Sequence, residues 1–149
     1  MLTRTPEQIA LAETSRLCQE MIDMCRDAAE QTSEPRLQQV LVKLIEDHGR
    51  LQAAVDERLA ALDDLPLSPD PEWEGLKKLA TRTKKIFAAD ESAVLIDERI
   101  DDEKQLLSHV ADALKGALSA DTRACLQIVQ RTAEAALCLL LQARETLAS

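Results

Sequence analysis

Residues 35–62 read PRLQQVLVKLIEDHGRLQAAVDERLAAL, and this stretch decides the fold class. Its apolar residues recur at steps of three and four, which is the spacing of one face of an α-helix. The predicted buried stripe consists of Leu37, Val40, Leu41, Leu44, His48, Leu51, Val55, Leu59 and Leu62. We therefore expect one long amphipathic helix over residues 34–63, opened by Ser33 and Pro35.

The same periodicity on both sides of this stretch predicts further helices. Their expected ranges are residues 6–32, 73–88, 91–117 and 121–147. Thr5, Pro6 and Gln8 form a capping-box pattern for the first of them. Ser119 or Asp121 is expected to cap the last. Three prolines between residues 63 and 71 end the second helix, because proline cannot continue one.

Composition supports an all-α protein. The chain holds no tyrosine, one phenylalanine, one tryptophan and only three glycines. Strands favour aromatic and β-branched residues, whereas the leucine, alanine and glutamate that dominate here favour helices. At 149 residues, the chain is expected to form one domain over residues 1–149.

The connections predict how the helices are arranged. The joint near residues 32–35 is short, so the first two helices should form an antiparallel hairpin. The connection over residues 63–90 is long enough to return along the bundle, so that the next long helix starts at the same end as the second. The predicted fold is therefore a ferritin-like antiparallel four-helix bundle with a long crossover that contains an extra short helix.

Charge and hydropathy exclude several classes of function. The net charge of −9 argues against a nucleic-acid partner. The basic cluster over residues 77–85 is interpreted as a solvated helix face, with an interaction patch as the alternative. Residues 135–141 form the longest apolar run, which is too short for a membrane span, and no signal peptide is expected. The four cysteines include no Cys-x-x-Cys pair, so reduced thiols in the cytoplasm are expected.

Several residues resemble a known family. Leu37, Leu44, Arg50 and Leu59 keep its spacing, followed by Trp73, the pair Leu76-Lys77 and the acidic segment over residues 97–102. On these residues, the chain resembles a family of small bacterial ferritin-like proteins of unknown function, some of them described as stress-associated. The resemblance covers about residues 25–137 and implies the ferritin-like fold. The chain departs from the family by lacking most aromatic residues and a histidine in the last helix.

The ligands of a ferritin-like di-metal centre are missing from the sequence. Such a centre takes glutamates and Glu-x-x-His pairs that project into the bundle core. Ile45 stands three residues before His48, and Leu106 stands three residues before His109. The first helix is expected to turn its carboxylates outward. An intact di-iron site is therefore not predicted.

Two polar residues nevertheless fall on core stripes. His48 lies between Leu44 and Leu51, and Glu103 lies between Ile100 and Leu107. A buried carboxylate needs a partner, so we expect a His48–Glu103 pair that fixes helix register. Two alternatives are left open: helix rotation that exposes one or both residues, and a metal or thiol-redox site.

The candidate ligands of that site are Cys18, His48 and Glu103, since all three residue types bind zinc. No cofactor is otherwise expected. The acidic run over residues 97–103 is interpreted as a solvated, salt-bridged face, with a weak cation surface as the alternative. His109 is expected at the surface.

The predicted core stripe of the last helix consists of Cys125, Ile128, Val129, Thr132, Ala136, Leu139, Leu140, Ala143 and Leu147. This helix is nevertheless apolar on more than one side. Leu126, Leu137 and Leu141 widen its apolar arc beyond that of a helix buried on one face. Either the crossover helix or a second subunit could cover this extra face. We expect a non-catalytic bundle that acts through helix surfaces and forms a homo-oligomer, for which a dimer through the last helix is one candidate arrangement. The alternative is a metal-handling protein, for iron or zinc, with a degenerate or intersubunit site.

Overall fold

The computed structural model describes residues 4–62 and 91–148, and these residues form helices without any strand. The helices are α1 (Pro6–Gln31), α2 (Pro35–Ala61), α4 (Glu91–Leu114) and α5 (Ala120–Ala148). The all-α prediction is therefore confirmed for the described residues. The predicted helix over residues 73–88 lies outside them.

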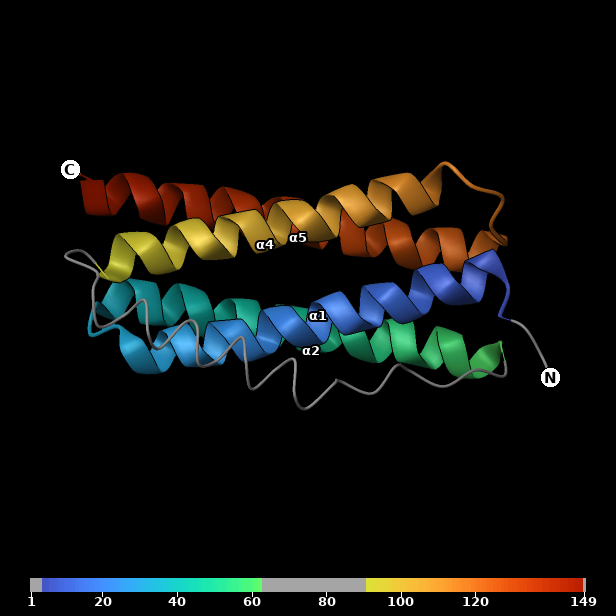
Figure 1. The fold of residues 1–149 in the computed structure, drawn as a ribbon, viewed down its shortest axis with the longest axis horizontal. Coiled ribbons are helices and arrows are strands. Elements are labelled where there is room, and N and C mark those ends of the chain that lie inside the picture. The colour runs from blue at the N-terminus through green and yellow to red at the C-terminus, as the bar shows by residue number, and fades with distance from the viewer. Residues whose placement is uncertain (1–3, 63–90, 149) are drawn as a thin grey trace.

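The four helices pack as two pairs laid side by side (Figure 1). α1 lies against α2 and α4, and α5 lies against α4 and α2. Gln8 donates a hydrogen bond of 2.8 Å to the carbonyl of Leu62, which joins the start of α1 to the end of α2. Figure 1 shows that α2 and α4 start at the same end of the bundle. A 3.1 Å hydrogen bond between Thr32 and Ser92 ties α4 to the joint between α1 and α2.

The start of α1 has the predicted capping box. The Thr5 hydroxyl accepts from the backbone N–H of Gln8, and the Gln8 side chain accepts from the backbone N–H of Thr5. The prediction for α2 was wrong in one detail, because its N-cap is Glu34 and not Ser33. Pro35 occupies the first turn, where its missing N–H costs nothing.

The joint between α4 and α5 is held in part by an arginine of α5 itself. Arg123 donates to the carbonyls of Leu114 and Gly116, at 2.8 and 2.9 Å. These bonds satisfy backbone acceptors where α4 ends, three residues before the predicted limit of 117. At the start of α5, the Ser119 hydroxyl accepts from the Thr122 N–H, as predicted for a capping residue.

The buried core consists of two apolar clusters, one toward each end of the bundle. One cluster includes Leu51, Leu106 and Ala133, and the other includes Leu44, Ile100 and Ala136. The predicted stripe of α2 is confirmed at its main positions. Those buried in the structure are Leu37, Leu41, Leu44, His48, Leu51, Val55 and Leu59.

The predicted core face of α5 was partly wrong. Ile128, assigned to the core, is 49% exposed, whereas Leu126 and Ala133 are fully buried. Leu137 packs against the core at partial burial, so Leu141 is the only one of the three widening leucines that is strongly exposed among the described residues. When a helix is apolar on several sides, the periodicity of its sequence does not show which side faces the core.

The expectation that α1 turns all its carboxylates outward was also wrong. Asp27 is buried, and its Oδ2 atom has no hydrogen-bond partner. The buried positions of α1 include Ala12, Ser15 and Met24 as well as Cys18 and Cys25. The buried face of α1 is therefore wide enough to include Asp27, whose carboxylate was expected to face solvent.

Candidate functional site

A polar layer separates the two apolar clusters of the core. It is formed by His48 of α2 and Glu103 of α4, both fully buried. His48 Nε2 lies 2.8 Å from Glu103 Oε1, and His48 Nδ1 lies 2.7 Å from the carbonyl oxygen of Leu44. The predicted pair therefore forms. Rotation of either residue to the surface, one of the alternatives, is wrong.

The hydrogen bonds of His48 fix the proton count of this layer. A carbonyl only accepts, so Nδ1 must carry a proton that it donates to Leu44. Nε2 and Glu103 Oε1 then need one proton between them, because a lone pair facing a carboxylate would be repulsive. The pair is either imidazolium with carboxylate or neutral imidazole with carboxylic acid. In both forms it holds one shared proton.

Burial and pairing act on both pKa values. Burial alone would lower the pKa of His48, but the hydrogen bond and charge of Glu103 outweigh it and raise the pKa above 6.5. Burial also raises the pKa of Glu103 above 4.5, against the opposing effect of the His48 hydrogen bond. Both directions favour keeping the shared proton. The second oxygen of Glu103, Oε2, is buried without a hydrogen-bond partner.

Cys18, the third candidate, is also fully buried in α1. Burial, followed by the negative charge of Glu103, raises the pKa of its thiol. Burial likewise raises the pKa of Cys25 to about 12, and the Cys25 thiol donates to the sulfur of Met21 at 3.6 Å. Both thiols are therefore held in the protonated form, which is a poor metal ligand and a poor nucleophile.

The described residues do not fit a metal centre well. Among residues 4–62 and 91–148, no group of three or more histidine, cysteine, aspartate or glutamate side chains is arranged to hold an ion. His48 Nε2 and Glu103 Oε1 face each other at 2.8 Å, so neither atom is free to bind a metal ion. Of these two side chains, only Glu103 Oε2 is left as an unpaired metal-ligand atom. Neither the di-metal centre of ferritin-like proteins nor a three-ligand zinc site is built from this layer.

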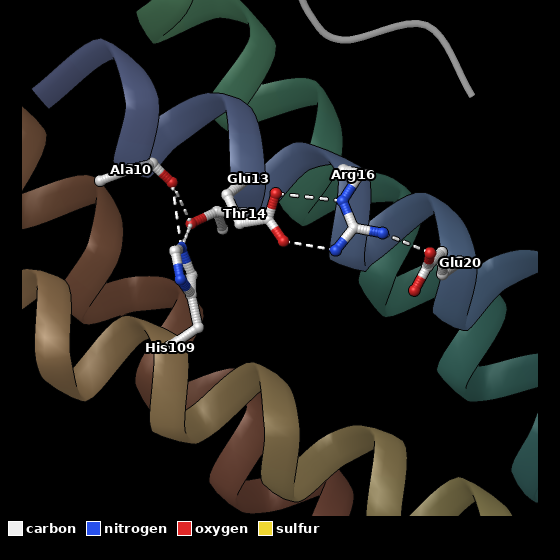
Figure 2. A network of polar contacts seen from close by, with 6 residues as sticks. All are labelled: Ala10, Glu13, Thr14, Arg16, Glu20 and His109. Carbon is white, nitrogen blue, oxygen red and sulfur yellow. Dashed lines mark hydrogen bonds and ion pairs between the residues drawn. The ribbon is translucent and has the colours of Figure 1, made fainter. Parts of the chain in front are cut away.

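A second polar cluster joins α1 to α4 (Figure 2). His109, predicted at the surface, is half-buried, and its Nε2 lies 3.1 Å from both the Ala10 carbonyl and the Thr14 hydroxyl. The Thr14 hydroxyl itself donates to Ala10 at 2.7 Å, so it accepts from His109. The surface prediction was therefore wrong: His109 Nε2–H is a structural donor between helices.

Next to this cluster, Arg16 binds Glu13 and Glu20 along α1 (Figure 2). The hydrogen bond from Arg16 outweighs partial burial and lowers the pKa of Glu13. Side chains three and four residues apart on a helix commonly pair in this way. Arg16 therefore pairs with both of these carboxylates.

The face formed by α2 and α5 is hollowed along its length. Three hollows follow one another between these helices, with volumes of about 290, 570 and 360 Å³. The first and second share Leu139, and the second and third share Leu51, Ala54 and Ile128. They therefore form one continuous groove, which we call the α2–α5 groove.

The walls of the α2–α5 groove are mainly apolar and its rim is charged. Ile128 is 49% exposed within it. The middle hollow is rimmed by three cations, Lys43, Arg50 and Arg131, and by the carboxylate of Asp47. The hollow near the start of α5 is rimmed instead by two carboxylates, Glu57 and Asp121, and one cation, Arg58. Charge of opposite sign thus predominates in two adjacent parts of the groove.

α5 is unusually apolar for a helix so open to solvent. Residues Ala120–Leu147 are long and apolar enough, by length and composition, to cross a membrane, although a core helix of a soluble protein passes the same test. Only 28% of its most apolar window is buried in the bundle. Sequence periodicity did not identify this face, because it assigned Ile128 to the core.

Comparison of the chain with known protein families, curated proteins and solved structures found no match. The resemblance to small ferritin-like proteins thus stays a prediction.

Proposed function

We propose that this chain is a non-catalytic, ferritin-like helical bundle that acts through a helix surface and self-associates across the α2–α5 groove. The order in which the helices contact one another supports a ferritin-like antiparallel bundle, with residues 63–90 as its crossover. The single observation that carries self-association is the continuous apolar groove around the exposed Ile128.

Self-association would cover this groove. Contiguous apolar surface is uncommon on monomers and marks interaction sites. Two-fold dimers are the commonest oligomers, and in them the same surface of each copy packs against its counterpart. The basic and acidic parts of the rim add charge complementarity between two copies.

Sedimentation velocity of matched variants tests the proposal. Ile128→Glu places a charge in the groove and should yield a folded monomer. Val42→Glu is the control, since Val42 is also 49% exposed and does not line any of the three hollows. The wild type and Val42→Glu should both dimerise. A wild type that stays monomeric, or an Ile128→Glu variant that still dimerises, would contradict the proposal.

A metal-handling role is the second candidate, and one observation favours it. Glu103 Oε2 is a buried oxygen without a partner beside an imidazole. This candidate ranks second because His48 and Glu103 supply two ligand groups, fewer than the three or four that zinc takes from protein. Metal analysis of protein purified without chelator tests it. Stoichiometric iron or zinc that disappears in Glu103→Gln would support this role.

A further inference from the structure

We infer that two copies of this chain meet about a two-fold axis at the level of Ala54 and Ile128, so that Arg131 of each copy binds Glu57 of the other. The inference rests on the proposed self-association and specifies its register. It follows from the positions of four exposed residues on two helices that run in opposite directions.

Ala54 and Ile128 define one level of the α2–α5 groove. Both line the middle hollow and the adjacent acidic one, on opposite walls. Ile128 is the most exposed large apolar residue of the described part of α5. An axis at this level brings Ile128 against its own counterpart, which covers the most exposed large apolar side chain in the described part of α5.

Arg131 and Glu57 lie at equal distances on the two sides of this level. Arg131 follows Ile128 by three residues on α5, and Glu57 follows Ala54 by three residues on α2. Three residues correspond to about 4.5 Å along a helix. Because α2 and α5 run in opposite directions, the two side chains are displaced in opposite senses along the groove.

A two-fold axis exchanges these two positions. An axis that runs across the groove reverses the direction along it and places α2 over α2 and α5 over α5, so Glu57 of each copy comes to the level of the partner's Arg131. The same operation sets the cation-rich middle hollow of each copy over the acidic hollow of its partner. A two-fold axis along the groove would instead place each hollow over the same hollow of the partner. Like charges would then face one another, which disfavours association.

Charge reversal tests the register. Glu57→Arg and Arg131→Glu each place like charges at both contacts of the dimer, and each should weaken self-association by about tenfold or more. An equimolar mixture of the two variants should regain association as a heterodimer. The double variant Glu57→Arg/Arg131→Glu should regain it alone. Both positions are exposed, and circular dichroism of the single variants checks that the helices are kept.

Cross-linking provides an independent readout. Ile128→Cys in a Cys138→Ser background should give a covalent dimer with a short bis-maleimide, because the axis brings residue 128 of both copies together. Val42→Cys in the same background should not, as Val42 lies outside the three hollows.

The outcomes separate the register from the proposed function. A wild type that dimerises, with single reversals that weaken association and a mixture that restores it, supports the register. Single reversals that associate as tightly as the wild type, while Ile128→Glu dissociates, would overturn the register and leave self-association through the groove intact. A wild type that remains monomeric overturns both.

Discussion

At the residue scale, the His48–Glu103 pair is the best-defined polar feature of the core. It crosses from α2 to α4 and is the polar break between the two apolar clusters. Because a slip of either helix would leave both groups buried without a partner, the pair favours one register of α2 against α4.

Replacement of Glu103 should show this coupling. Glu103→Ala leaves His48 Nε2 buried without its partner and should lower the free energy of unfolding by roughly 1–3 kcal/mol. Glu103→Gln should cost less, because its amide N–H can donate to Nε2. The double change His48→Leu/Glu103→Leu should cost less than the two single leucine changes added together. Urea titration measures all of these, and strictly additive losses would show that the side chains act independently.

The pair should also make stability depend on pH. In the unfolded chain, His48 loses its proton near pH 6.5, whereas the folded pair retains one. Its stabilising contribution is therefore complete below pH 6.5 and is lost as the pH rises through the raised folded-state pKa. The free energy of unfolding should fall by up to about 1.4 kcal/mol per pH unit in this window. Glu103→Gln should remove this slope, and an unchanged slope would contradict the shared proton.

Thiol reactivity should follow burial. Burial raises the pKa of Cys18, Cys25 and Cys125, whereas Cys138 is exposed on α5. At neutral pH, a thiol-specific disulfide reagent should modify Cys138 rapidly and the other three slowly or not at all. All four should react in denaturant. Rapid modification of Cys18 in the folded protein would contradict its burial in the core.

At the element scale, sequence predicted helix starts better than helix faces. Thr5 and Ser119 cap α1 and α5 as expected, because capping depends on local backbone groups. The inward face of α5 could not be predicted at Ile128, since several faces of this helix are apolar. His109 and Asp27 were misplaced because their burial depends on neighbouring helices, which no local pattern encodes.

Arg123 should stabilise the end of α4. It donates to two carbonyls at the end of the helix, those of Leu114 and Gly116. Arg123→Ala should lower the free energy of unfolding by roughly 1 kcal/mol, because water replaces these bonds only in part. Arg26→Ala, at an exposed position on α1, is the matched control and should have little effect. Equal effects of the two changes in thermal melts would argue against a capping role.

At the scale of the whole molecule, the all-α class and the central His48–Glu103 layer could be predicted from the sequence, because a stripe with one polar residue at its centre marks a buried pair. The α2–α5 groove could not, since it depends on how α5 is rotated against α2. The proposed self-association takes place through this groove.

Sedimentation equilibrium of the unmodified chain tests the central claim most directly. The chain has a mass of 16.5 kDa. We predict a concentration-dependent rise toward twice that mass, reversed when Ile128 is replaced by glutamate. A mass that stays at 16.5 kDa over the full concentration range would contradict self-association through the α2–α5 groove.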